Sequence, residues 1–294
     1  MSGGDSLRRF LFERFPVRGK LVRLEQSWQA VLERQAYPPA VRAVLGEAMA
    51  ASVLLASTLK FEGLLTLQIQ GEGDLHLLVV QCGSDLTVRG LAKWKSDDPQ
   101  GSLAELTGGG RLAITIERGK QHERYQGIVQ ADTETLAGCL EGYFARSEQL
   151  PTRLWLAADA GGAAGMLLQQ MPGGTGDEEA EEGWRRAGML ADTVSADELL
   201  EVETRELLHR LFHEEDLRLA DSRAVAFRCS CSRERVESAL RLLGRAELAD
   251  LLSVEGQVEV RCEFCNKGYD LDTVDVERLL SDEGPRPPAS ERLH

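Results

Sequence analysis

Two closely spaced cysteine pairs constrain the fold of this 294-residue chain more than any other feature. Cys229 and Cys231 are separated by one residue, Cys262 and Cys265 by two, and thirty residues lie between the pairs. Four thiolates at such a spacing can converge on one tetrahedral Zn²⁺, a metal soft enough to prefer sulfur. A one-residue gap in a strand would place the two side chains on opposite faces. We therefore expect a turn, and not a strand, between Cys229 and Cys231.

The segment around these cysteines, residues 224–281, is predicted to form a small unit of its own. A short strand at Ala224–Arg228, a helix from about Ser232 to Gly244, a second short helix and a hairpin-like Val258–Tyr269 are expected in it. A unit of about 58 residues is small for a self-supporting core and normally needs a metal or a disulfide. We expect zinc to stabilise this unit and to take part in its function. The alternatives are a zinc site with a purely structural role and four buried cysteines without metal.

Residues 1–175 are predicted to be an α+β domain around an antiparallel or mixed sheet, because strand and helix patterns do not alternate regularly there. Apolar runs and turn signals predict several strands. They lie at Gly63–Gln70, Leu75–Val80, Leu86–Trp94, Leu112–Glu117, Arg124–Val129, Arg153–Ala158 and Gly165–Gln170. Helical spacing predicts helices at Gln26–Gln35, Pro39–Leu59 and Thr133–Arg146.

Residues 176–223 are predicted to be an acidic linker that contains an amphipathic helix. Residues 177–216 hold 14 acidic and four basic residues, a net charge of −10. The glycines and acidic residues of 171–183 indicate a mobile connection, with order resuming at about Ser195. Ser195 and Glu198 match a capping box. The residues after them are expected to form a helix whose apolar face docks on a neighbour, and this face is made by Leu200, Leu207, Leu208 and Leu211.

The overall charge and the apolar patterning exclude several classes of protein. The chain has 48 acidic and 34 basic residues, a net charge of −14, which argues against a nucleic-acid partner. The richest apolar stretch, Ala48–Leu59, is shorter than the roughly 18 residues of a membrane-spanning helix. Charged residues interrupt residues 1–20, so no secretion signal is expected. We expect a cytoplasmic protein without a membrane partner, and a disordered tail at residues 282–294.

The charge around the cysteines has the opposite sign to that of the chain. Five basic residues flank the thiols and two acidic residues oppose them, a local net charge of +3. The basic residues are Arg228, Arg233, Arg235, Arg261 and Lys267, and the acidic residues are Glu234 and Glu263. Positive charge favours thiolates and attracts anionic oxidants, so this environment indicates reactive as well as metal-binding cysteines.

Four segments carry a family resemblance. They are Phe227–Arg235 (FRCSCSRER), Cys262–Asn266 (CEFCN), Tyr143–Thr152 (YFARSEQLPT) and Gly165–Gln169 (GMLLQ). Together they resemble the heat shock protein 33 family of redox-regulated bacterial holdase chaperones. The likeness extends over most of the chain, although the N-terminal 60 residues match in character more than in any motif.

The resemblance implies a chaperone without catalytic residues, and not an enzyme. In the reduced form, Cys229, Cys231, Cys262 and Cys265 are expected to bind one Zn²⁺ per chain and the protein to be inactive. The family pattern implies that oxidants pair Cys229 with Cys231 and Cys262 with Cys265, that zinc leaves and that the linker loosens. Residues 1–175 are then expected to bind unfolding client proteins without ATP, and the oxidised form to be a homodimer.

Two other classes of function stay open at this point. One is a zinc-ribbon-like nucleic-acid-binding protein, and the other is a thiol-disulfide oxidoreductase. The remaining candidate residues point elsewhere: Cys82 and Cys139 lie in apolar contexts typical of inert core thiols. His209 and His213 are four residues apart on the predicted linker helix, without a suitably spaced third ligand for a metal.

Overall fold

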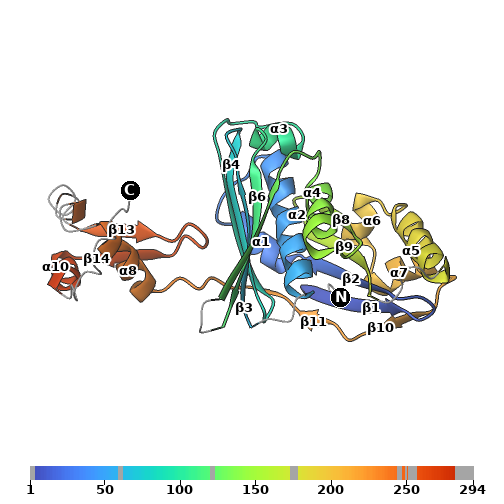
Figure 1. Cartoon of the computed structure of the whole chain (residues 1–294). Coiled ribbons are helices and arrows are strands. Elements are labelled where there is room, and N and C mark those ends of the chain that lie inside the picture. Colours follow the sequence, from blue (N-terminus) through green and yellow to red (C-terminus); the bar gives the residue numbers. More distant parts are fainter. Residues whose placement is uncertain are drawn as a thin grey trace, which may run out of the picture. The chain divides into compact units, whose positions relative to one another are not determined.

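The computed structural model describes residues 4–58, 62–119, 123–172, 178–243, 247–248, 250 and 257–281. The chain forms two compact units, Met1–Arg228 and Cys229–His294 (Figure 1). Sheets and helices both contribute to the first unit, so the predicted α+β class is confirmed. The finer division of the chain at residues 175, 223 and 281 stays a prediction.

Sheet A of the first unit has the strand order β10-β1-β2-β9-β8, with β11 also paired to β1. All its pairs are antiparallel. The strands are β1 (Ser6–Phe12), β2 (Val17–Leu24), β8 (Thr152–Ala158), β9 (Ala163–Gln170), β10 (Leu217–Leu219) and β11 (Arg223–Ala224). The sequence analysis did not anticipate β1 and β2, because arginine, lysine and glycine residues interrupt their apolar pattern.

Sheet B has the order β12-β5-β4-β3-β6-β7. Only the short β12 runs parallel to its neighbour among the strands the structure describes. The strands are β3 (Gly63–Gln70), β4 (Leu75–Gly83), β5 (Thr87–Trp94), β6 (Arg111–Arg118), β7 (Glu123–Gln130) and β12 (Ala226–Phe227). The predicted strands of this sheet agree with these bounds to within three residues at each end.

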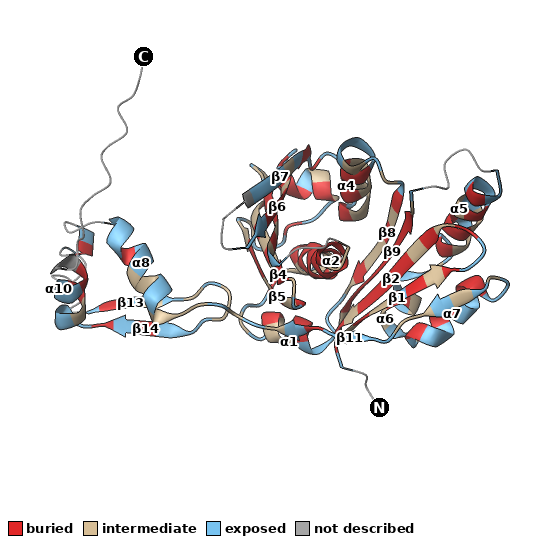
Figure 2. Ribbon diagram, turned by 60° about the horizontal axis from the view of Figure 1, so that its bottom comes forward, coloured by how far each residue is buried: buried red, intermediate tan, exposed pale blue. Residues whose placement is uncertain are grey.

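Helix α2 (Pro39–Ala56) lies between the two sheets and is buried along most of its length (Figure 2). Leu45, Met49 and Val53 are fully buried against both sheets in what we call the inner core, which also contains Leu7, Val22 and Leu67. The length and composition of α2 would suit a membrane-spanning helix, but 72% of its 18-residue apolar stretch is buried inside the fold. The apolar character of α2 is therefore explained by its position between two sheets.

Shorter helices complete this part of the first unit. They are α1 (Gln26–Leu32), α3 (Leu103–Thr107), α4 (Leu136–Tyr143) and the π-helix η1 (Phe144–Glu148). Ser102 and Glu105 form a capping box at the start of α3, and the Thr135 side chain accepts from Gly138 N at the start of α4. These caps satisfy backbone donors that a helix leaves free at its first turn.

Three helices cover the face of sheet A that points away from α2 (Figure 2). They are α5 (Glu178–Ala191), α6 (Ala196–Glu201) and α7 (Thr204–Phe212). Residues of α5 and α7 pack with sheet residues in what we call the outer core, which includes Phe10, Phe12, Leu21, Met166, Leu168, Ala187, Leu207, Leu208, Leu211 and Phe212. Sheet A is therefore buried on both faces.

Two expectations for this segment were wrong. Order does not resume at Ser195, because α5 already begins at Glu178. The helix after Ser195 is also two helices, since the chain leaves helical geometry at Val202 and restarts at Thr204, where Glu203 caps the first turn. The Ser195–Glu198 capping box is confirmed.

The start of α5 escaped prediction because glycines precede it and glutamates occupy its first turn, a composition typical of a mobile connection. Its buried positions are alanine and glycine, and the larger side chains of Trp184 and Leu190 pack against the outer core. A Cβ added at Gly183 would lie 2.4 Å from the ring of Phe15, which shows how closely this helix approaches the sheet. Glu178, Glu179 and Glu181 lie in its first turn, where the helix dipole stabilises their negative charge.

The chain returns from α7 along the edges of both sheets. β10 and β11 pair with β1 of sheet A, and β12 then pairs with β5 of sheet B. The guanidinium of Arg34 lies 4.4 Å from the centre of the Phe227 ring and holds the end of this segment against the first unit. The residues that follow enter the second unit.

The second unit has a small core of its own. Its described elements are α8 (Arg233–Leu243), β13 (Val258–Arg261), β14 (Gly268–Leu271) and α10 (Thr273–Ser281). The hairpin and the first helix agree with prediction, α10 was not anticipated, and the second short helix lies largely outside the described residues, as does the tail at 282–294. The buried apolar side chains are Leu240, Leu248, Val258, Leu271, Val276 and Leu279.

A buried lysine occupies the open end of sheet A, just beyond the last turn of α2. Lys20 is 4% exposed, and its Nζ donates to Ser57 Oγ at 2.9 Å and Thr58 Oγ1 at 2.8 Å. Both hydroxyls donate their own protons to the carbonyl oxygen of Leu54. Burial, together with repulsion from nearby arginines, lowers the pKa of Lys20 from 10.5 to about 6. The folded protein therefore holds this side chain neutral at pH 7.

Lys20→Met is expected to increase the free energy of unfolding at pH 7 by up to about 5 kcal/mol, because pH 7 lies about 3.5 units below the unfolded pKa of 10.5 and each unit is worth about 1.4 kcal/mol. The unfolded chain protonates Lys20 up to about pH 10.5 and the folded chain only up to about pH 6, so the stability of the parent rises with pH across this window. The variant lacks that contribution. Chemical denaturation at pH 6.5 and pH 9 measures both slopes, with Lys95→Met as the exposed-lysine control. Equal slopes for the parent and Lys20→Met would contradict the prediction.

Candidate metal centre

The four predicted cysteines lie together in the second unit. All four Sγ atoms are within 4.8 Å of one another. The Sγ atoms of Cys229 and Cys262 are 3.6 Å apart, and those of Cys231 and Cys265 are 3.4 Å apart. These two short contacts each join one cysteine of the first pair to one of the second. The four side chains are partly exposed, so the cluster is accessible to small molecules.

A tight turn positions the second pair. Strands β13 and β14 are paired up to Arg261 and Gly268, and Cys262 and Cys265 lie in the loop that joins them. The N–H groups of Cys265 and Asn266 both donate to the carbonyl oxygen of Cys262. Asn266 has a φ of +56°, a left-handed conformation that asparagine adopts more readily than most residues. The turn thus brings two thiols to one side of the hairpin end.

The first pair lies in the segment between β12 and α8. This segment has no regular secondary structure at Cys229 and Cys231, so the predicted absence of a strand there is confirmed. Helix α8 begins at Arg233, two residues after Cys231. The positive end of its dipole therefore lies next to the thiols, where it favours their ionised form.

The arrangement fits a tetrahedral ion with sulfur ligands. Zinc–sulfur bonds of about 2.3 Å give a regular tetrahedron with edges of about 3.8 Å. The two sulfur–sulfur separations across the pairs, 3.4 and 3.6 Å, are close to that edge. Among the residues that the structure describes, this is the one group of three or more potential ligands that converges in this way.

Two of the four thiols, those of Cys262 and Cys265, have a pKa above that of a free cysteine. Burial raises the pKa of Cys265 to about 12, and its hydrogen bonds with neighbouring thiols contribute to the shift. Burial also raises the pKa of Cys262. A divalent cation bound here has to displace these protons, so its affinity falls as the pH is lowered.

Tyr269 is a further member of the centre that the sequence analysis missed. Its hydroxyl donates to Cys231 Sγ at 3.2 Å, and this hydrogen bond raises the pKa of Tyr269 to about 12. Lys267 Nζ lies 5.2 Å from the centre of the same ring. A donor to a ligand sulfur orients that ligand and stabilises its negative charge. The spacing of Tyr269 on the predicted hairpin, four residues after Cys265, was the only signal in the sequence.

The structure pairs much of the positive charge that the sequence analysis counted around the cysteines. Arg233 forms ion pairs with Glu237, at 3.1 Å, and with Asp275. Arg261 pairs with Glu259 at 2.5 Å. The count of +3 left out these acids, although Glu237 and Glu259 lie on the same elements as their partners and only Asp275 is distant along the chain. The local field at the thiols is therefore weaker than the sequence count implies.

The other two cysteines are core residues. Cys82 is fully buried in β4, and Cys139 is 2% exposed in α4. Burial raises the pKa of the Cys82 thiol to about 12 and that of Cys139 to about 11. Both observations agree with the expectation that these thiols are inert.

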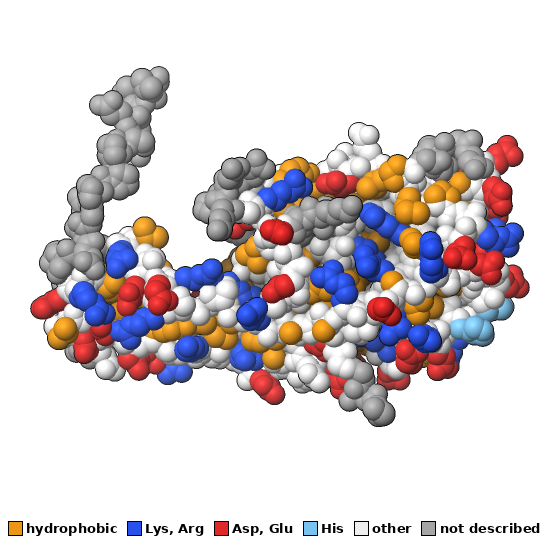
Figure 3. Space-filling view, turned by 90° about the horizontal axis from the view of Figure 1, so that it is seen from below, with side chains coloured by type: hydrophobic (Ala, Val, Ile, Leu, Met, Phe, Trp, Pro, Cys, Tyr) orange, Lys and Arg blue, Asp and Glu red, His pale blue; other side chains and the backbone are white. Residues whose placement is uncertain are grey.

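The remaining candidate residues lie on the helices that cover sheet A. Leu207, Leu208 and Leu211 are buried in the outer core, and Leu200 packs against it. The Phe212 ring, which the sequence analysis did not single out, meets that of Phe12 edge-on at 5.1 Å. His209 lies on the exposed side of α7 and His213 directly follows this helix, with ring centres 6.2 Å apart. The histidines visible in the space-filling view have acidic side chains near them (Figure 3).

Comparisons with known proteins agree with one another. The family model described as "Hsp33 protein" matches residues 5–272. The 33 kDa chaperonin of Nitrosococcus oceani is 48% identical over 292 residues, which cover 99% of this chain and 100% of that protein. The 33 kDa chaperonin of Chromobacterium violaceum is 49% identical over 282 residues, 95% of each chain.

A solved structure shows the same fold. The crystal structure of the 33 kDa chaperonin from Thermotoga maritima superposes with a TM-score of 0.80 and 26% identity, covering 94% of this chain and 98% of that one. The motifs around the cysteines, the fold and the whole-length matches lead to one assignment. This chain belongs to the Hsp33 family.

Proposed function

We propose that this protein is a redox-regulated, ATP-independent holdase chaperone of the cytoplasm, and not an enzyme. The observation that carries the proposal is the cluster of four thiols in a unit with a small core. Family membership and relatives named 33 kDa chaperonin support the chaperone function. The partners are unfolding client proteins, and the oxidised form is a homodimer.

In the reduced form, Cys229, Cys231, Cys262 and Cys265 hold one Zn²⁺ per chain. Bound zinc supplies a structural cross-link, worth an apparent ~10 to 16 kcal/mol to folding in small zinc domains. Six buried apolar side chains of the described part of this unit are a modest core without that link. The second unit is therefore folded when the thiols bind metal, and its stability depends on their redox state.

Oxidation removes the cross-link. A peroxide-class oxidant takes two electrons from each cysteine pair; each pair forms one S–S bond and each peroxide is reduced to water. Following the family pattern, Cys229 pairs with Cys231 and Cys262 with Cys265. Such pairs close rings of only a few residues, so they constrain the unfolded chain little and cannot replace the metal. Pairing between the motifs would instead close loops of about 30 residues and keep the unit together.

The outer core is the surface that the switch controls. Helices α5 to α7 cover Phe10, Phe12, Leu21, Met166 and Leu168 on sheet A. Their release would expose a continuous apolar face on a rigid sheet, and exposed apolar patches of this kind bind other proteins. Leu200, Leu207, Leu208 and Leu211 form the gate in this proposal. The covered state corresponds to the inactive chaperone.

The first test follows metal, disulfides and chaperone activity in one sample. The reduced protein is expected to contain one zinc ion per chain and to leave the aggregation of an unfolding client unchanged in light scattering. Peroxide treatment is expected to release the zinc, detected with a chromogenic chelator, and to suppress aggregation. Peptide mapping should find the two local disulfides. Bonds mainly between the two motifs, or full activity with zinc still bound, would overturn the switch.

The second test places a charge in the gate. Leu207 is fully buried, and an unpaired carboxylate at that position costs several kcal/mol, comparable to what a single amphipathic helix gains by docking. Reduced, zinc-loaded Leu207→Asp is therefore expected to suppress client aggregation and to bind a hydrophobic dye without oxidant. His209→Asp adds the same charge to the exposed side of α7 and should stay silent. A folded Leu207→Asp variant as inactive as the parent would show that this face is not the gate.

The third test concerns Tyr269. Tyr269→Phe removes the hydroxyl that donates to Cys231 Sγ and keeps the ring, so zinc affinity is expected to fall by about tenfold. Competition with a calibrated chelator measures the change. Tyr125→Phe, in the first unit, is the matched control because its hydroxyl hydrogen-bonds to Glu148 and not to a thiol. Unchanged affinity in Tyr269→Phe would exclude a role for this hydrogen bond.

A further inference from the structure

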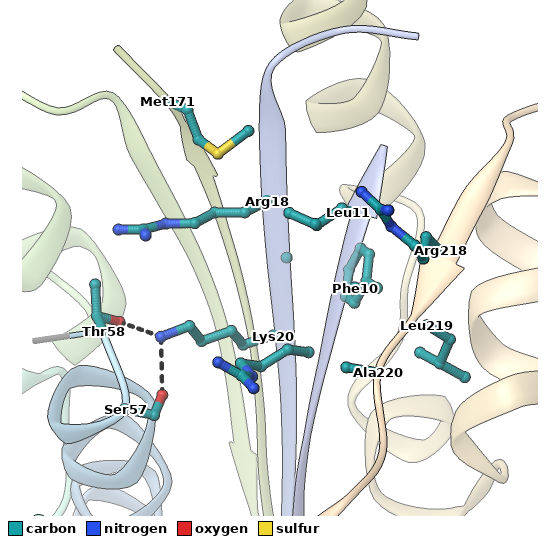
Figure 4. Close-up of a pocket in the computed structure, with 12 residues that line it drawn as sticks. Phe10, Leu11, Arg18, Lys20, Ser57, Thr58, Met171, Arg218, Leu219 and Ala220 are labelled. Atoms are coloured by element: carbon teal, nitrogen blue, oxygen red, sulfur yellow. Dashed lines mark hydrogen bonds between the residues drawn. The ribbon is translucent and has the colours of Figure 1, made fainter. Parts of the chain in front are cut away.

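A cavity in the first unit collects cationic side chains from neighbouring strands. It has a volume of about 500 Å³ and lies at the end of sheet A that α2 does not cover (Figure 4). Arg9, Arg18, Lys20 and Arg218 line it, together with the hydroxyls of Ser57 and Thr58. No acidic side chain is among the described residues that line it. Such a concentration of one charge is unusual in a chain with a net charge of −14.

Strand register explains how these side chains come together. Arg9 on β1 lies directly opposite Lys20 on β2, and Leu11 lies opposite both Arg18 on β2 and Arg218 on β10. All of them therefore point to the same face of sheet A, the face that carries the inner core further along. Like charges directly opposite each other in a sheet destabilise the pairing. This repulsion between Arg9 and the protonated form of Lys20 occurs just beyond the end of α2.

The deepest basic group of the cavity, Lys20, is a neutral amine at pH 7 and has no anionic partner, among the side chains that the structure describes, that would favour its protonation. Lys20 Nζ donates to Ser57 and Thr58 (Figure 4), which uses both N–H bonds of the neutral amine, and the third N–H that protonation adds has no acceptor among the described residues. Within the described part of the chain, no carboxylate forms an ion pair with Lys20, Arg9 or Arg18. A buried ammonium normally requires a paired anion.

The cations that surround Lys20 differ in how firmly they are held. Arg18 is positioned by donation to Gln169 Oε1. Arg218 has Glu13 at 3.7 Å, and both of those side chains are mostly exposed at the rim. The centre of the cavity is thus basic and uncompensated, and its rim is partly neutralised.

We propose that this cavity binds a small anion that carries two or more phosphoryl groups. The donors approach from three strands, which suits tetrahedral phosphoryl oxygens better than a planar carboxylate. From β10 to β2 they span two strand spacings, about 10 Å, so they can contact more than one phosphoryl group. Arginine donors in pairs match phosphate oxygens in charge and geometry. The inference is independent of the chaperone proposal, because it concerns the reduced protein and needs no client.

Titration calorimetry of the reduced, full-length protein with inorganic pyrophosphate tests the proposal. Saturable binding is expected, with inorganic phosphate weaker and sodium chloride at equal ionic strength without effect. Glycerol phosphate, a phosphate ester with one phosphoryl group, distinguishes an organic phosphate from an inorganic one. Binding is expected to weaken by about tenfold or more in Lys20→Met and in Arg18→Gln, and to stay unchanged in Lys95→Met. Lys20→Met is expected to be stable, and Arg18→Gln provides an independent second variant.

Proton uptake gives a second readout. The groups facing Lys20 are Arg9 on β1, Arg18 on β2, Arg223 on β11 and the hydroxyls of Ser57 and Thr58. A bound anion should protonate Lys20, so the number of protons taken up on binding at pH 7.5, measured from binding enthalpies in several buffers, is larger in the parent than in Lys20→Met, where only pyrophosphate itself exchanges protons. Pyrophosphate binding no stronger than the salt control, or equal binding by the parent and Lys20→Met, would overturn the proposal.

Discussion

The burial of sheet A on both faces is the constraint on which the rest of the first unit depends. Every residue of β9 is buried, because one face of that strand meets α2 and the other meets the covering helices. A sheet with two apolar faces cannot stand alone in water. Helices α5 to α7 have an acidic outer surface, but the apolar outer face of sheet A is shielded from solvent only while these helices cover it.

Stability is distributed very unevenly between the two units. The first unit contains two large apolar cores, and the second contains a small one in addition to its four thiols. Conditions that affect sulfur chemistry therefore act on the unit with the least alternative support. The first unit keeps its cysteines buried, so the same conditions leave its core intact.

Much of the fold was predictable where the spacing of apolar residues was regular and glycine-rich turns marked the ends of elements, as in the strands of sheet B and in α2. The cysteine cluster was predictable because two close cysteine pairs along a chain are typical of a single metal site. α5 was missed because the glycines before it and the glutamates of its first turn resemble a mobile connection, and β1 and β2 were missed because cationic residues interrupt their alternation. Tyr269 contacts Cys231 across 38 residues of sequence, a contact that only the three-dimensional arrangement reveals.

The segment from Leu217 to Phe227 satisfies backbone hydrogen-bonding groups at the edges of both sheets. β10 and β11 occupy the edge of β1, and β12 occupies the edge of β5, so one stretch of chain covers one edge of each sheet. If this stretch leaves its place, two rows of peptide N–H and C=O groups lose their partners. Such open edges pair with any extended polypeptide regardless of its sequence. For the proposed holdase function, these edges would add a mode of capture that does not depend on matching side chains.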